Sequence, residues 1–414
     1  MKQIYVSIQI DSGYIKILVA EYFNSRFNIL KYSSKKSKAC DCYEIVDYDL
    51  LVSDIKDLVD STSKAIGAKI EKVLLLLPEY NFKRFPLKSS IVLNEGYVKL
   101  EDISRAITNS LRSKVDDDVM VINAVPVKYS INGISTRRIP ENEVGSNMDV
   151  DIDLLCADKQ MSYQFVKAIE DAGLEVVDVC LNNYGILKEA GLVNESAQKN
   201  TILIDINYAS TTMSLVSKGK LITTEILHEG LNSFINKVYY THHIPYDDIE
   251  KLIKYLKLDF ESEDIVYAFS SDNKSFNIKI NELSLTISEC INTYVDKIIT
   301  LCKPILEDNN VNIYVVGVGE EMNSLVDAIK DKSSVEVKAY YPDTIGVRDS
   351  SVTGLFGALF DYKDKVALHN LNTSFIDLLE YDSVIDQKNI DSDGDTITTK
   401  IKNFFMQYMN KEDK

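Results

Sequence analysis

Several features that define whole classes of protein are missing from this chain of 414 residues. No stretch approaches the ~18 consecutive apolar residues that a membrane-spanning helix needs. The six cysteines form no Cys-x-x-Cys pair and are too dilute for a disulfide framework. The four histidines form no His-Glu-x-x-His arrangement, the pattern of a catalytic zinc helix. We therefore expect a cytosolic protein with reduced cysteines and no zinc centre.

Basic charge is also scarce. The chain has 63 acidic side chains against 46 Lys and Arg, which gives a formal net charge of -17 at pH 7. Such a surface repels nucleic-acid phosphate and anionic lipid, so we expect no nucleic-acid partner and only local membrane contact. The hydrophobic fraction of 45% is typical of a globular protein. At ~100–200 residues per domain, the length allows two to four domains.

Two similar segments, one in each half of the chain, consist of a strand, a short turn and a returning strand. In the first half, residues 4–10 and 15–19 alternate as strands around the turn Asp11-Ser12-Gly13. In the second half, the strands at 201–204 and 211–216 flank a turn that begins at Asp205. Helical periodicity follows each pair of strands. The pattern predicts an α/β protein with an internal duplication.

Each of these turns carries an acidic residue, Asp11 or Asp205. Turns of this kind place converging backbone N–H groups around phosphates, while the carboxylates hold Mg²⁺ through water. This chemistry requires the two turns to face each other. A third segment runs from a strand into Gly317 and Gly319, where a base or ribose can lie against exposed backbone. Because Asp and Gly are also ordinary turn residues, a purely structural role is the alternative for each turn taken alone.

Further segments divide the chain into domains. We expect inserted subdomains at two places where strand and helix patterns interrupt the duplicated halves. The predicted boundaries are a first core domain at 1–81 and 162–198 with an inserted subdomain at 82–161, and a second core domain at 199–244 and 307–360 with an inserted subdomain at 245–306. The last core helix is predicted at 350–359, where Gly354 and Gly357 allow close approach to neighbouring backbone.

The last part of the chain changes composition twice. Residues 361–394 carry eight acidic side chains against three lysines and little periodicity, which predicts a tethering linker. Residues 395–414 predict an amphipathic helix that lies in the membrane surface. Its apolar stripe consists of Ile397, Ile401, Phe404, Phe405, Tyr408 and Met409. A helix docked on the core would present the same stripe, and this is the alternative.

The order of these elements resembles the FtsA family of bacterial cell-division proteins, in the actin-like ATPase superfamily, over nearly the whole chain. Residues 8–16 stand where that family has its first phosphate loop, and residues 140–145 look like part of its inserted subdomain. Residues 172–176 match the step that returns to the first core domain. An amphipathic helix after an acidic tether is the family's most recognisable extra element. The resemblance implies an actin-like, ribonuclease-H-like duplicated fold of two core domains, each with an inserted subdomain.

The resemblance also implies ATP and Mg²⁺ in the cleft between the two phosphate loops. Lys16 would neutralise phosphate charge, and the carboxylates of Asp11 and Asp205 would orient metal-bound water. The residues that the resemblance assigns to the nucleotide are Asp11, Ser12, Gly13, Lys16, Asp205, Thr211, Thr212, Gly230, Gly317 and Gly319.

The second phosphate loop departs from the family pattern, which is close to Asp-Ile-Gly-Gly-Gly-Thr-Thr. Here the run from Asp205 to Thr212 reads Asp-Ile-Asn-Tyr-Ala-Ser-Thr-Thr. Without the three glycines the backbone has less room to wrap a γ-phosphate. We therefore expect slow or absent ATP turnover, at most a weak ATPase, and assign no catalytic residue.

By this resemblance the protein would be a scaffold. It would bind ATP, assemble into filaments with itself, and tether the C-terminal tail of the tubulin-like protein FtsZ to lipids at the cytoplasmic face of the cell membrane, at the division site. The alternative is a PilM-type pilus-assembly protein, which shares the inserted subdomain but should lack the terminal amphipathic helix. A sugar or small-metabolite kinase of the same superfamily is a third possibility, which the altered second loop disfavours.

Overall fold

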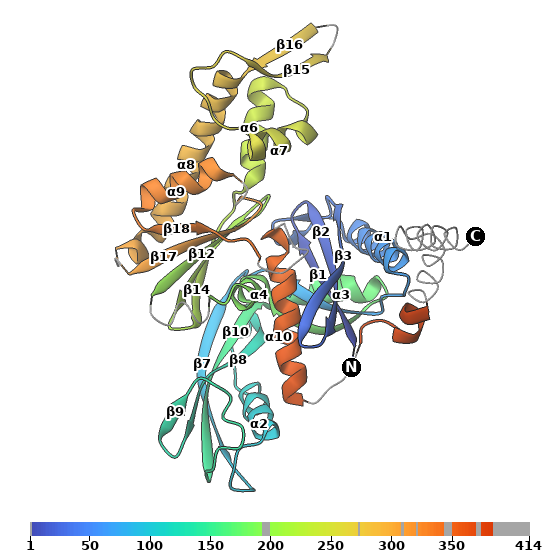
Figure 1. Ribbon diagram of the computed structural model, residues 1–414, viewed down its shortest axis with the longest axis vertical. Helices are drawn as coiled ribbons and strands as arrows, with labels where there is room; N and C mark the ends of the chain where they lie inside the picture. Colours follow the sequence, from blue (N-terminus) through green and yellow to red (C-terminus); the bar gives the residue numbers. More distant parts are fainter. Residues whose placement is uncertain are drawn as a thin grey trace, which may run out of the picture.

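Two α/β core domains lie side by side in the computed structural model of the chain, and a further subdomain extends from each toward opposite ends of the molecule (Figure 1). The structure describes residues 2–192, 199–271, 274–307, 310–319, 322–342, 350–369 and 374–383, and the statements below refer to these. The predicted membrane helix at 395–414 lies outside the described residues. None of the described helices is both long and apolar enough to cross a membrane.

The first core sheet has five strands in the order β11-β6-β1-β2-β3. Their bounds are β11 (Glu175–Leu181), β6 (Lys72–Leu77), β1 (Gln3–Asp11), β2 (Tyr14–Phe23) and β3 (Arg26–Lys36). Strand β6 lies between two parallel neighbours and buries five successive residues, which explains its continuous apolar run. The helices of this core are α1 (Tyr48–Ile66), α3 (Lys159–Asp171) and α4 (Asn182–Glu189), and a short hairpin of β4 (Cys40–Asp41) and β5 (Glu44–Ile45) precedes α1.

The second core sheet repeats this plan in the order β14-β13-β12-β17-β18. Its elements are β12 (Asn200–Ile206), β13 (Thr211–Ser217), β14 (Lys220–Leu227), β17 (Val311–Gly317), β18 (Glu336–Ala339) and helix α9 (Asn323–Ser333). Strand β12 pairs antiparallel with β13 and parallel with β17, as β1 pairs with β2 and β6. The predicted duplication is therefore present in the strand pairing itself.

Each inserted segment has its own architecture. The first is a four-stranded sheet in the order β7-β10-β8-β9 with helix α2 (Leu100–Ser110), and it has a separate hydrophobic core. Its strands are β7 (Lys83–Val92), β8 (Val119–Ile131), β9 (Ile134–Thr136) and β10 (Asn147–Asp158). The second consists of α7 (Tyr246–Tyr255), α8 (Ile280–Leu306) and the hairpin of β15 (Ile265–Ser271) and β16 (Lys274–Lys279), and it packs with α6 (Leu231–His242), which precedes the predicted boundary at residue 245.

Helix α10 (Thr353–His369), which follows the short 3-10 helix η1 (Ser350–Val352), runs along the first core domain and crosses α4 (Figure 1). A Cβ atom at Gly357 would lie 1.8 Å from the backbone oxygen of Gly185, so the two helices touch backbone to backbone. This is the close approach that the sequence predicts for Gly354 and Gly357. The helix is longer than predicted, because it continues to His369 instead of ending near residue 359.

The predicted linker at 361–394 is wrong in its described part. Residues 361–369 belong to α10, and the segment 374–383 packs on the first core domain. Phe375 is buried, its N–H donates to the backbone oxygen of Ile4 at 2.8 Å, and its ring meets the rings of Tyr5 and Tyr362 edge-on. Acidic composition dominated the prediction, whereas a few apolar anchors decided the packing.

Candidate functional site

The two acidic turns predicted from the sequence meet in the cleft between the core domains. One joins β1 to β2 and carries Asp11, and the other joins β12 to β13 and begins at Asp205. Both carboxylates line one small cavity of about 20 Å³. Ser210 of the second turn and Thr212 of β13 also line it, together with Glu79, which follows the end of β6. The structure therefore brings the two predicted metal-orienting residues together.

Asp11 lies beside the one predicted cation of the site. Its Oδ2 is 3.8 Å from Lys16 Nζ, and its Oδ1 accepts a hydrogen bond from the backbone N–H of Ser12 at 2.7 Å. Burial raises the pKa of the Asp11 carboxyl, although the Lys16 ammonium and the Ser12 N–H oppose the shift. Lys16 is itself buried and also donates to the backbone oxygen of Ser351 at 3.5 Å. The cation is thus engaged within the protein.

Asp205 accepts two side-chain amide hydrogen bonds. The donors are Asn182 Nδ2 at 2.8 Å and Asn207 Nδ2 at 3.0 Å, both to Oδ2. Burial raises the pKa of Asp205 to about 6, and the neighbouring charge of Asp11 adds to the shift. Neutral amides, rather than cations, are the direct partners of this carboxylate.

Glu79 and Gln9 belong to the site, and the sequence analysis missed both. Glu79 Oε1 accepts from the backbone N–H of Asn183 at 2.5 Å, and burial raises the pKa of the Glu79 carboxyl to about 8. Gln9 Oε1 and Asp11 Oδ2 are buried without a hydrogen-bond partner among the described residues. Glu79 follows strand β6, which is parallel to β1, and parallel strands end at the same sheet edge. That position is the signal that could have identified it.

Three of the four predicted glycines, Gly230, Gly317 and Gly319, pack against the second turn, and none of the four lines the cavity. A Cβ atom at Gly230 would lie 2.1 Å from the backbone oxygen of Asn207, and one at Gly317 would lie 2.4 Å from that of Ile206. A Cβ atom at Gly319 would meet the Ile206 side chain at 2.7 Å. Gly13 has a positive φ of 88° with open space around it, as a tight turn requires.

Thr211 also turns away from the cavity. Its hydroxyl is hydrogen bonded to the backbone oxygen of Glu229 at 2.8 Å and to the hydroxyl of Tyr294 on α8. Of the two predicted threonines, only Thr212 lines the space between the turns.

Two tyrosines occupy the cleft beside the turns. Tyr14, at the start of β2, and Tyr208, in the second turn, stack with ring centroids 4.8 Å apart and an interplanar angle of 30°. The hydroxyl of Tyr208 donates to Glu250 Oε1 on α7 at 2.6 Å. On another side, the hydroxyl of Tyr43 donates to Ser210 Oγ at 3.2 Å. The sequence analysis treated Tyr208 only as a substitution in the second phosphate loop and assigned no role to Tyr14 or Tyr43.

Comparison with known proteins identifies relatives along the whole chain. No family model matches it. The chain is 23% identical over 436 residues to the cell division protein FtsA of Enterococcus hirae, an alignment that covers 97% of this chain and 98% of that protein. It is 23% identical over 363 residues to FtsA of Streptococcus pneumoniae, covering 83% and 77% respectively. The chain is a relative of FtsA.

Solved structures show the fold. A chain of the PilM-PilN type IV pilus biogenesis complex superposes with a TM-score of 0.57 at 13% identity, covering 86% of this chain and 98% of that one. MreB5 of Spiroplasma citri, solved bound to ADP, superposes with a TM-score of 0.52 at 13% identity, covering 89% and 99%. The predicted actin-like α/β fold is confirmed.

The cavity between the two turns of this FtsA relative, as the described residues form it, is too small for a nucleotide. Ligand pockets for small molecules measure roughly 300–1,000 Å³, whereas about 20 Å³ holds a single water. Three carboxylates, those of Asp11, Glu79 and Asp205, line the cavity, and Lys16, whose Nζ lies 3.8 Å from Asp11 Oδ2, offsets part of their charge. Among the described residues, no three His, Cys, Asp or Glu side chains are grouped so that they could hold a metal ion directly. Mg²⁺ held through water by Asp11 and Asp205 stays a prediction.

Proposed function

We propose that this protein is an actin-like cell-division scaffold that acts as FtsA does. The observation that carries the proposal is the alignment with FtsA of Enterococcus hirae, which includes 97% of this chain and 98% of that protein. A similarity of this extent includes both core domains and both inserted segments. The proposal requires no ATP step, because the residues present do not fit a nucleotide in the closed cleft.

The finer role that we propose is to tether the C-terminal tail of FtsZ to the cytoplasmic face of the membrane at the division site. The apolar stripe of residues 395–414 and its four lysines support it, since these residues carry a net positive charge in a chain of -17. Burying six such side chains contributes on the order of 5–10 kcal/mol when they are partly immersed. Ordering some fifteen residues costs about 1 kcal/mol each or more, so one anchor is marginal. Self-assembly into filaments would make many anchors act together.

The test is co-sedimentation of the full chain with purified FtsZ and anionic phospholipid vesicles. We expect the double substitution Phe404→Glu with Phe405→Glu to reduce vesicle binding at least about tenfold, because it removes apolar surface and adds two charges. Its matched control, Asn403→Glu with Gln407→Glu, adds the same charge away from the stripe and should retain most binding. FtsZ binding should be equal in all three proteins. Full vesicle binding by the Phe404 and Phe405 variant would disprove the anchor.

A PilM-like role is the second candidate, since a PilM-PilN chain superposes over 98% of its length. Binding of FtsZ separates the two candidates. A chain that fails to sediment with FtsZ polymers, yet is retained on vesicles, would contradict the cell-division proposal and favour an adaptor for a different membrane partner.

A further inference from the structure

We propose that the interdomain cleft of this protein is closed by its own aromatic side chains, with the stacked pair Tyr14 and Tyr208 standing in for a nucleotide. The closed arrangement of the two core domains would then need no ATP. This inference does not rest on the proposed role in cell division, because it concerns how the two halves of the fold are held together.

The pair arises from the duplication. Tyr14 stands three positions after Asp11, and Tyr208 stands three positions after Asp205, so each turn carries a tyrosine at the same place. The two rings stack across the cleft at 4.8 Å, which is within the preferred range for aromatic pairs. Tyr14 belongs to the first core sheet but packs against the hydrophobic cluster of the second core domain. The stack therefore joins the two halves.

Tyr208 fills space that a glycine would leave empty. It stands where the family pattern has the middle of its three glycines, and its side chain is only 9% exposed. Its hydroxyl donates to Glu250 on α7, and Glu250 is in turn paired with Lys254 at 3.3 Å. The Glu250 carboxylate is thus engaged by groups of the protein itself.

The β4–β5 hairpin covers the same turn from the first core domain. Cys42 Sγ lies 3.7 Å from the backbone oxygen of Ala209, and the Tyr43 hydroxyl donates to Ser210. Tyr43 is itself buried and stacks on Tyr80 with centroids 5.2 Å apart. Successive positions of the second turn therefore contact the first core domain, which explains why so little free volume is left between the turns.

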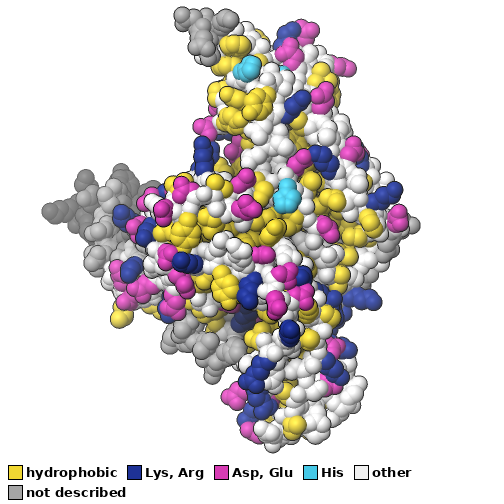
Figure 2. All heavy atoms as spheres, turned by 180° about the vertical axis from the view of Figure 1, so that it is seen from behind, with side chains coloured by type: hydrophobic (Ala, Val, Ile, Leu, Met, Phe, Trp, Pro, Cys, Tyr) yellow, Lys and Arg dark blue, Asp and Glu magenta, His cyan; other side chains and the backbone are white. Residues whose placement is uncertain are grey.

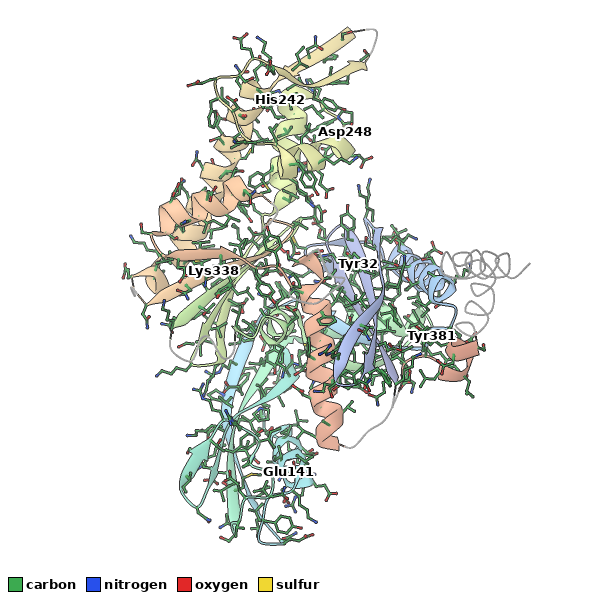
Figure 3. The ribbon with its side chains drawn as sticks, in the orientation of Figure 1. Tyr32, Glu141, His242, Asp248, Lys338 and Tyr381 are labelled. Atoms are coloured by element: carbon green, nitrogen blue, oxygen red, sulfur yellow. The ribbon has the colours of Figure 1, made fainter. Side chains whose placement is uncertain are left out.

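Polar contacts between the halves surround the stack. On the rim, Lys36 Nζ on β3 lies 3.0 Å from Asp247 Oδ1 at the start of α7, the helix marked by the labelled Asp248 in Figure 3. Inside, Asn182 and Asn183 on α4 donate to Asp205 and to Ser214 Oγ on the second core sheet, at 2.8 Å and 2.9 Å. Neutral amides thus bridge the two core domains beside Asp205.

The first experiment measures nucleotide binding by the full chain. We expect 1 mM ATP or ADP, each with Mg²⁺, to leave the melting temperature of the native protein unchanged, since a ligand stabilises the folded state only when its concentration approaches or exceeds its dissociation constant. We expect Tyr208→Ala to bind ADP at least about tenfold more tightly than the native protein, because it clears volume beside the turns. The control Tyr163→Ala removes an exposed tyrosine on α3 and should behave as the native protein does.

The second experiment uses the native protein, so it tests the proposal even if the Tyr208→Ala variant fails to fold. Hydrogen exchange should show slow exchange at the N–H groups of Asn207, Leu231 and Asn232 without nucleotide, because each is hydrogen bonded at the second turn. Addition of ATP should change these rates less than about twofold. Fast exchange without nucleotide that slows on adding ATP, or an ATP-dependent rise in melting temperature of the native protein, would overturn the proposal. Binding to FtsZ is a separate measurement and would not change with either outcome.

Discussion

At the residue scale, the cleft concentrates ionisable groups where water is scarce. The carboxyls of Asp11, Glu79 and Asp205 line one cavity, and burial raises the pKa of each. Lys16 lies beside Asp11 and offsets part of this negative charge. In such a site the charged carboxylate is disfavoured, so the folded state retains protons that the unfolded chain releases.

This protonation makes part of the stability depend on pH. The pKa of Asp205 is raised to about 6 in the folded state from an ordinary value near 3.8, so its contribution is complete below about pH 4 and is lost as the pH rises through 6. At 1.36 kcal/mol per pKa unit, the loss is on the order of 2–3 kcal/mol. We expect Asp205→Asn to remove this part of the decline. The free energies of unfolding of the native protein and of Asp205→Asn, measured in urea at pH 4.5 and pH 7, check this expectation.

A control for this measurement is available in the same cavity. The pKa of Glu79 is raised to about 8, so the decline that Glu79→Gln removes should extend to higher pH than that of Asp205→Asn. Identical pH profiles for the native protein and Asp205→Asn would show that Asp205 titrates normally in the folded protein.

At the element scale, the crossing of α10 and α4 depends on glycine. A Cβ atom at Gly357 would lie 1.8 Å from the backbone oxygen of Gly185, and backbone cannot yield as a flexible side chain does. We expect Gly357→Ala to lower the free energy of unfolding by about 2–3 kcal/mol through overpacking. Gly133→Ala is the control, since a Cβ atom there meets nothing within 4 Å and only the positive φ costs energy. If chemical denaturation showed that Gly357→Ala and Gly133→Ala lose equal free energies of unfolding, this would contradict a tight crossing of α10 and α4.

The segment after α10 is a second element whose packing can be measured. Phe375 is 1% exposed and lies among the rings of Tyr5 and Tyr362, while Tyr381, labelled in Figure 3, lies under the ammonium of Lys2 at 4.5 Å. We expect Phe375→Ala to lower the free energy of unfolding by about 3–5 kcal/mol, as truncation of other buried aromatic side chains does. Truncation after residue 383 should leave the melting temperature within a few degrees of the native value. If this segment were a flexible tether, Phe375→Ala would leave the free energy of unfolding unchanged.

At the scale of the whole molecule, net charge opposes assembly. Acidic and basic side chains are interspersed over the face shown in Figure 2, but the total of -17 per subunit makes copies repel one another. The Debye length falls from about 10 Å at 0.1 M to about 3 Å at 1 M salt, so screening weakens this repulsion. We expect self-association through the core domains to increase with salt until screening is complete. Light scattering that stays flat across salt and lipid conditions would argue against filaments.

Local sequence patterns were enough to predict much of the fold of this protein. Alternation on either side of the Asp11 and Asp205 turns predicts the two hairpins, and their repetition predicts the duplicated sheets, because strand pairing across a short turn depends on neighbouring residues. Gly354 and Gly357 predict a close helix contact for the same local reason, since only an absent side chain permits it. The meeting of Asp11 and Asp205 was a requirement of the predicted chemistry, and in the structure both carboxylates line one cavity.

The tertiary structure alone decided what fills the cleft. Tyr14 and Tyr208 are almost 200 positions apart in the sequence. Taken separately, Tyr14 is an ordinary residue at the start of a strand and Tyr208 is an ordinary residue of a turn. Only the packing of the two halves stacks their rings. Glu79 enters the site because β6 lies beside β1, a pairing between distant segments. Residues 374–383 belong to the run that composition predicts as an acidic linker, with room for a short helix around 375–379, yet Phe375 and Tyr381 are buried and the Phe375 N–H donates to Ile4 of β1. In each case the deciding free energy comes from contacts between parts of the chain that no local pattern relates.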